Sequence, residues 1–144
     1  MVKSNFLRFL FYLSFPVCVF LFNVFLILAF DIYQNFPEAD IPMHFLGGAS
    51  IAYSCVLFFD FFKAKKWIKL DNKIIFIVLV VSMVSVVAVF WEFSEFIYSK
   101  LPVGHFFNIY MELELEDTLL DLFMGICGGF LVPFLILIFE GNFD

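Results

Sequence analysis

Three pairs of ionisable side chains fall at helical spacing near the ends of apolar segments: Asp40 with His44, Glu92 with Glu95, and Asp117 with Asp121. Residues three or four positions apart lie on one face of a helix, so each pair points in one direction. If those faces turn toward one another, five carboxylates and one imidazole converge. Carboxylates at close range cannot all stay ionised without a cation or captured protons.

Carboxylate oxygens with one imidazole suit Mg²⁺, Ca²⁺, Mn²⁺ or, with fewer ligands, Zn²⁺. Lys100 is the only basic residue expected on the same side, so the chain supplies little compensating charge. We therefore expect a divalent metal ion to be held by a set of candidate ligands: His44, Glu92, Glu95, Asp117 and Asp121, with Asp40 as an additional candidate. The sequence has no Glu-x-x-His motif of the dinuclear bundle sites, so the identity of the metal stays open. A cationic ligand or shared protons are the alternatives.

Helix capping is a competing explanation for two of these residues. Asp40 and Asp117 precede apolar runs, and Asp is among the residues favoured at a helix N-cap. Thr118 is an alternative cap of the last run, with Asp121 closing a turn like a capping box. Glu92 and Glu95 have a different alternative, since from a helix end they could reach into headgroup water. His44, Glu92 and Asp121 are expected about one turn inside the membrane boundary, where ionisable residues are costly and function is favoured.

The elements that must position these residues are membrane helices. Hydrophobic residues make up 64% of the 144-residue chain and charged residues only 15%, whereas a soluble domain carries about 25% charged residues. Apolar runs cover 9–30, 43–62, 74–98 and 118–139, close to the roughly 20 residues that cross a bilayer core. Backbone polar groups must be paired in lipid, so these runs are expected to be helices. The sequence predicts an all-α membrane protein: one integral domain over 1–144 that forms an antiparallel four-helix transmembrane bundle.

The basic residues predict the orientation of this bundle. Seven of the eight precede the first run or lie near the loop between the second and third: Lys3, Arg8, Lys63, Lys65, Lys66, Lys69 and Lys73. Because cytoplasmic loops are enriched in Lys and Arg, both termini are expected in the cytoplasm. Glu92 and Glu95 follow Ile74 by 18 and 21 residues, which places them roughly 27 and 32 Å away, at the outer membrane face. The lysines between the second and third runs form a short segment whose positive charge is already explained by this topology. We therefore expect membrane lipids as partners and do not expect nucleic acid.

Small residues indicate where two of the helices approach each other. The second run contains Gly47 and Gly48, and the fourth contains Gly125, Gly128 and Gly129. Glycines on facing helices permit close backbone approach in membranes. We expect these two helices to pack tightly together.

The polar motifs also resemble segments of a known family. The matching positions are His44 and Gly47 in His-x-x-Gly, Trp91, Glu92 and Glu95 in Trp-Glu-x-x-Glu, and Asp117, Thr118 and Asp121 in Asp-Thr-x-x-Asp. Over about residues 40–133, these segments look like those of YjdF-type bacterial inner-membrane proteins, which are similar to the VanZ-like group. The resemblance implies a multi-pass protein of the bacterial cytoplasmic (inner) membrane, and the VanZ-like group is linked with teicoplanin resistance. It implies no catalytic residue.

Three functions are compatible with these features. The first is a metal-dependent protein that acts on or binds an envelope or lipid-linked ligand, in which a metal held by His44, Glu92 and Asp121 activates water or an oxygen atom and Glu95 or Asp117 acts as base. The second is a non-catalytic accessory or structural membrane protein, alone or as a homo-oligomer. The third is a cation or proton transporter, which is less favoured because transporter sites usually lie near the midplane. The sequence contains no Ser-His or Cys-His nucleophile motif that would identify the protein as an enzyme, so this question stays undecided.

Overall fold

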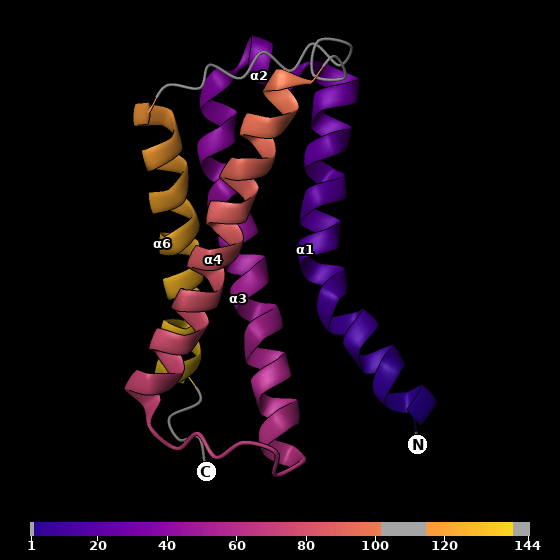
Figure 1. The fold of residues 1–144 in the computed structure, drawn as a ribbon, viewed down its shortest axis with the longest axis vertical. Helices are drawn as coiled ribbons and strands as arrows, with labels where there is room; N and C mark the ends of the chain where they lie inside the picture. The colour runs from indigo at the N-terminus through magenta and orange to yellow at the C-terminus, as the bar shows by residue number, and fades with distance from the viewer. Residues whose placement is uncertain (1, 102–114, 140–144) are drawn as a thin grey trace.

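Four long helices dominate the computed structural model, which describes residues 2–101 and 115–139. They are α1 (Val2–Phe30), α3 (Asp40–Ala64), α4 (Lys73–Lys100) and α6 (Leu115–Phe139), and they extend along the long axis of the molecule (Figure 1). All four are long and apolar enough to cross a membrane, which confirms the predicted all-α class with four candidate spans. The helices begin earlier than predicted, at 2, 40, 73 and 115 rather than 9, 43, 74 and 118, because each helix continues beyond its apolar run.

The link between the first two long helices carries structure that the sequence did not predict. Helix α2 (Ile32–Asn35) and a 3₁₀ turn, η1 (Pro37–Ala39), lead directly into α3. Asp31 begins α2 in a left-handed backbone conformation, with φ of 46°. Asp tolerates this conformation better than most residues, so it permits the sharp turn out of α1.

The tightest helix packing lies between α3 and α6, at two glycines. A Cβ on Gly48 would overlap the backbone carbonyl of Gly125, and one on Gly128 would overlap that of Phe45. A Cβ on Gly129 would lie 2.7 Å from Cγ1 of Val84 in α4. Gly47 is different, because no described atom lies within 4 Å of the position its Cβ would take. Close approach therefore depends on Gly48, Gly128 and Gly129, and Gly47 takes no part in it.

Helix α1 packs mainly through aromatic side chains. Phe9 lies 5.5 Å from Phe58 and 5.1 Å from Phe61, between ring centroids. Phe15 contacts Tyr53 edge to face at 4.7 Å. Edge-to-face contacts of this kind add to the gain from apolar burial. None of the α1 window is buried inside the chain, so the other face of α1 is available to lipid.

Helix α4 begins with a side-chain cap that gives a first testable prediction. The Asn72 side chain accepts hydrogen bonds from the backbone N–H groups of Ile74 and Ile75, at 2.9 and 3.1 Å. Asn72→Ala leaves both donors without this partner and is expected to destabilise the fold by about 1 kcal/mol. Asn72→Asp retains an acceptor and is expected to unfold like the parent. Equal losses for both variants, measured by reversible unfolding in mixed micelles, would contradict the capping role.

Candidate cation site

Five of the six candidate residues come together at one end of the bundle. Asp40 and His44 lie in the first turns of α3, Glu92 and Glu95 in the last turns of α4, and Asp121 near the start of α6. This is the end of the molecule at which α2 lies (Figure 1). Three helices that are distant in sequence therefore supply one cluster, which we call the acidic cluster.

His44 is at the centre of this cluster. Its Nε2 atom lies 3.5 Å from Oδ1 of Asp40 and 3.7 Å from Oδ2 of Asp121. On the other side of the ring, Nδ1 lies 3.7 Å from Oε1 of Glu92. These distances exceed the 2.7–3.2 Å range typical of N–H···O hydrogen bonds. The imidazole is thus surrounded by carboxylates that it approaches without forming good hydrogen bonds.

The side chains of the cluster are largely removed from solvent. The exposed fraction is 9% for His44, 4% for Asp121, 11% for Glu92 and 16% for Asp40. Within the described residues, Oε1 of Glu92 and Oδ1 of Asp121 are buried and have no hydrogen-bond partner. A buried polar atom without a partner costs free energy. The arrangement therefore provides buried acceptors to which a cation could bind.

Glu95 is engaged differently from the other acids. The indole N–H of Trp91 donates a 2.6 Å hydrogen bond to Oε1 of Glu95, one turn further along α4. The ligand atoms form two groups in which all lie within 4.8 Å of one another, Asp40 with His44 and Asp121, and His44 with Glu92 and Glu95. Both groups use His44, and only the second contains a carboxylate held by an indole.

Asp117 lies apart from these groups. It is exposed, and among the described residues it is not part of either set of ligand atoms. The capping explanation also changes, because α6 begins at Leu115 and Asp117 is inside its first turn. Asp40 likewise lies within α3, whose N-cap position is Ala39. The structure places Asp40 in the cluster and Asp117 at its margin.

Tyr33 is a neighbour of the cluster that is not among the candidate residues predicted from the sequence. Its hydroxyl donates a hydrogen bond to Oδ1 of Asn23 in α1. Burial, with a contribution from the nearby negative charge of Asp40, raises the pKa of Tyr33 above its usual range. The phenol therefore stays protonated and connects α2 to α1 beside the carboxylate of Asp40. An amide inside the first apolar run and a tyrosine shortly after it were the available signals.

The comparison with protein families agrees with the motifs. Residues 3–142 match the model of the family described as predicted membrane protein (DUF2238). The chain belongs to this family. DUF2238 is the YjdF-type family that the motifs resemble, so that part of the prediction is confirmed. No curated protein and no solved structure matches the chain.

Membership in DUF2238 supports the membrane assignment independently of composition. The family match covers all four long helices, and those helices have mean hydropathies between 1.6 and 3.0 over their most apolar windows. The family description states no activity.

Proposed function

We infer that the acidic cluster binds one small divalent cation through Asp40, His44 and Asp121. The observation that carries this proposal is the spacing around Nε2 of His44, which lies 3.5 and 3.7 Å from carboxylate oxygens of two helices. Two ligand atoms that each lie about 2.0–2.1 Å from a tetrahedral ion are about 3.3 Å apart. The separations of the His44 nitrogen from the two carboxylate oxygens are close to this value, as expected for atoms that bind the same ion. The buried, unpartnered Oδ1 of Asp121 supports the same proposal.

The position of Glu92 supports a separate role. Its Oε1 faces Nδ1 of His44 at 3.7 Å, on the opposite side of the ring from the proposed ion. A histidine that binds a metal through one nitrogen usually donates its other N–H to a carboxylate, which fixes the ring. We assign Glu92 this positioning role. The hydrogen bond from Trp91 keeps Glu95 occupied and makes it the less suitable ligand.

Orientation and ligand class extend the proposal. Seven of eight basic residues are distant from the acidic cluster in the sequence-based topology, so the positive-inside rule places the cluster at the outer face and both termini in the cytoplasm. In this topology the helices are antiparallel and cross a bacterial inner membrane. The cation would then help the protein to bind or act on an envelope or lipid-linked ligand.

The enclosure of the cluster favours a second candidate, a cation with a structural role in an accessory protein. Structural metal sites are closed, whereas catalytic ones keep a position open, and Asp121 is only 4% exposed. The ion would join α3 to α6 one turn above the Gly48–Gly125 contact. Backbone contact at that level also argues against a transport path between these two helices.

A cation titration tests the proposal directly. Protein purified in detergent is stripped with a chelator, and bound Zn²⁺, Mn²⁺, Mg²⁺ and Ca²⁺ are then measured by elemental analysis. We expect one tightly bound ion per chain for one of these metals. Saturation at 100 times the Kd should also stabilise the fold by about 2.7 kcal/mol. If no metal is retained and none shifts the unfolding midpoint, the cluster is not a cation site.

Glu92→Gln and Glu95→Gln separate the proposed roles of these residues. They are matched, because each replaces a carboxyl group by an amide of nearly the same shape in the same part of α4. Glu92→Gln should weaken cation binding by roughly 10- to 100-fold, as loss of an orienting carboxylate typically does. Glu95→Gln should have a smaller effect. A larger loss for Glu95→Gln would assign the ion to the His44, Glu92 and Glu95 group instead.

A further inference from the structure

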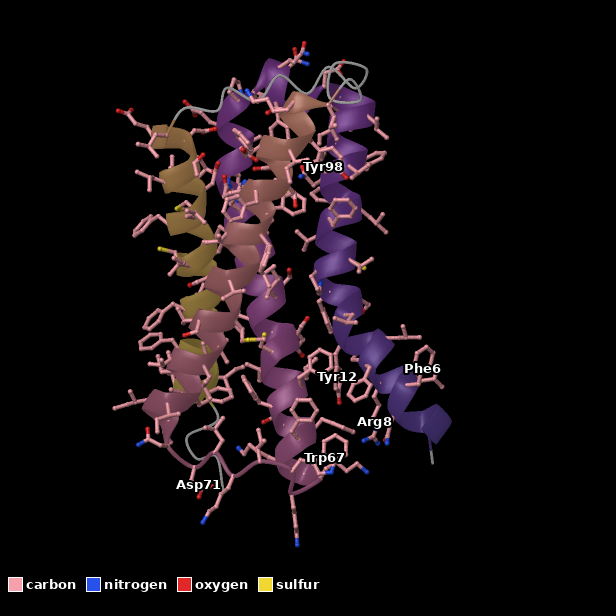
Figure 2. The ribbon with its side chains drawn as sticks, viewed as in Figure 1. Phe6, Arg8, Tyr12, Trp67, Asp71 and Tyr98 are labelled. Atoms are coloured by element: carbon pink, nitrogen blue, oxygen red, sulfur yellow. The ribbon has the colours of Figure 1, made fainter. Side chains whose placement is uncertain are left out.

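A basic and aromatic surface lies at the end of the molecule opposite the acidic cluster. Figure 2 shows Arg8 and Trp67 near this end, with Asp71 in the loop between α3 and α4. We call residues 63–73 the basic loop. It contains five lysines and one acid, Asp71. None of these residues contributes to the proposed cation site.

The end of α3 fixes the position of Trp67. Lys66 adopts a left-handed conformation with φ of 56°, and its N–H donates to the carbonyl of Lys63 at 2.8 Å. The N–H of Trp67 donates to the carbonyl of Phe62 at 3.0 Å. Together these two bonds form a Schellman motif, which ends the helix and satisfies its last carbonyls. Trp67 is therefore held by the backbone and is not a freely moving loop residue.

Aromatic contacts fix the indole ring as well. The ring of Trp67 stacks on Phe62 with centroids 5.7 Å apart and meets Phe61 edge to face at 5.9 Å. Nevertheless, 65% of Trp67 stays exposed. An exposed tryptophan at the end of a membrane helix is typical of the membrane–water interface, where one part of the ring is apolar and the other is wet.

Lysines flank Trp67 in the sequence. The Lys65 ammonium group lies 5.6 Å from the centre of the Phe61 ring, within the range of a cation–π contact. Lys65, Lys66 and Lys69 are all exposed. Lys69 lies 3.5 Å from Asp71, but both side chains are more than 70% exposed, so this pair neutralises little charge. The surface thus combines an interfacial aromatic ring with positive charge.

We propose that the basic loop binds the headgroup of an anionic phospholipid, with Trp67 at the interface and the Lys65 and Lys66 ammonium groups on the lipid phosphate. Charge complementarity identifies the ligand, because basic residues next to a membrane helix attract anionic lipids. The fixed Trp67 ring places the lysines at headgroup depth. This site is independent of the cation site and does not rest on it.

Bromine-labelled lipids provide the test, because Trp67 is one of only two tryptophans. In a Trp91→Phe background, Trp67 fluorescence is measured in vesicles that mix bromine-labelled phosphatidylglycerol with unlabelled phosphatidylcholine, and in vesicles with the label exchanged. We expect labelled phosphatidylglycerol to quench Trp67 more strongly than labelled phosphatidylcholine does. The affinity for phosphatidylglycerol relative to phosphatidylcholine should rise roughly fivefold for each lysine that contacts the lipid. Lys65→Gln with Lys66→Gln should abolish this preference. Millimolar inorganic phosphate should not compete, because the ligand is the membrane lipid.

Lys100→Gln is the matched control. Lys100 lies 5.5 Å from the ring of Phe96, nearly the same geometry as Lys65 on Phe61, but at the other end of the bundle. Lys100→Gln should therefore leave the lipid preference unchanged. Equal quenching by both lipids in the parent would overturn the proposal, as would equal effects of Lys100→Gln and the Lys65 and Lys66 substitutions. Circular dichroism of each variant shows whether a lost preference is a loss of folding.

Discussion

Asp121→Asn is expected to weaken cation binding by more than about 100-fold, which exceeds the loss typical of residues that only orient a ligand. Asp121 is the most buried member of the cluster, and its Oδ2 lies 3.7 Å from Nε2 of His44. The substitution removes one of three proposed ligands and one negative charge, with almost no change in volume. Competition against a metal-sensitive dye, in detergent and at constant pH, measures the change.

Asp117→Asn is the matched control for this prediction. Asp117 lies one turn earlier on the same helix, and the substitution makes the same change of charge and shape. Because Asp117 is exposed and outside both ligand groups of the described residues, its loss should change affinity only slightly. Equal losses for the two variants would mean that general negative charge, and not a defined ligand set, attracts the cation.

The stability of the metal-free protein gives Asp121→Asn a second readout. A buried carboxylate near Asp40 and Glu92 with an unpartnered oxygen destabilises the empty site. Its replacement by a neutral amide should therefore leave metal-free stability unchanged or raise it by about 1 kcal/mol. If Asp121 had only a structural role, Asp121→Asn would instead lower the stability of the metal-free protein. Unfolding with and without metal separates the two, since only the parent should gain stability when metal is added.

Gly48→Ala is expected to disrupt the packing of α3 against α6. The new Cβ would lie 2.7 Å from the carbonyl carbon of Gly125 and still closer to its oxygen. These are backbone atoms, so relief requires the two helices to separate. Overpacking of this kind costs typically 1–3 kcal/mol. Because His44 lies one turn away from Gly48, separation should also weaken cation binding. Reversible unfolding and metal titration measure the two effects.

Gly47→Ala and Gly125→Ala are the controls. A Cβ added at Gly47 would have no described atom within 4 Å. A Cβ added at Gly125 would lie 3.7 Å from Cβ of Ala88, which is an ordinary van der Waals contact. Both variants should be stable, since Ala is also the better helix former. If Gly47→Ala were as damaging as Gly48→Ala, the helix faces assigned here would be wrong.

Much of the fold could be predicted from hydropathy alone. Four apolar runs of sufficient length require helices in lipid. The polar residues at their ends predicted one shared level for six side chains, of which five come together and the sixth, Asp117, lies outside both ligand groups of the described residues. What hydropathy could not supply was helix phase. Gly47 and Gly48 are adjacent in sequence but differ by about 100° around the helix, so only one can face α6.

The detailed membership of the cluster also required the fold. Asp40 and Asp117 looked equivalent in sequence, since each precedes a partner by four positions. The structure encloses Asp40 because α2 and η1 lead directly into α3 and bring Tyr33 beside it. A short helix and a 3₁₀ turn leave no periodic signal long enough to recognise. For this reason Tyr33 was not predicted as the hydrogen-bond partner of Asn23.

X-ray absorption spectroscopy of the zinc-loaded protein tests the central claim most directly. We predict one imidazole nitrogen together with carboxylate oxygens at about 2.0–2.2 Å from the ion, and loss of the imidazole signal in His44→Gln. A coordination shell made only of oxygen atoms, unchanged in His44→Gln, would show that any bound ion lies elsewhere and would contradict the proposed site.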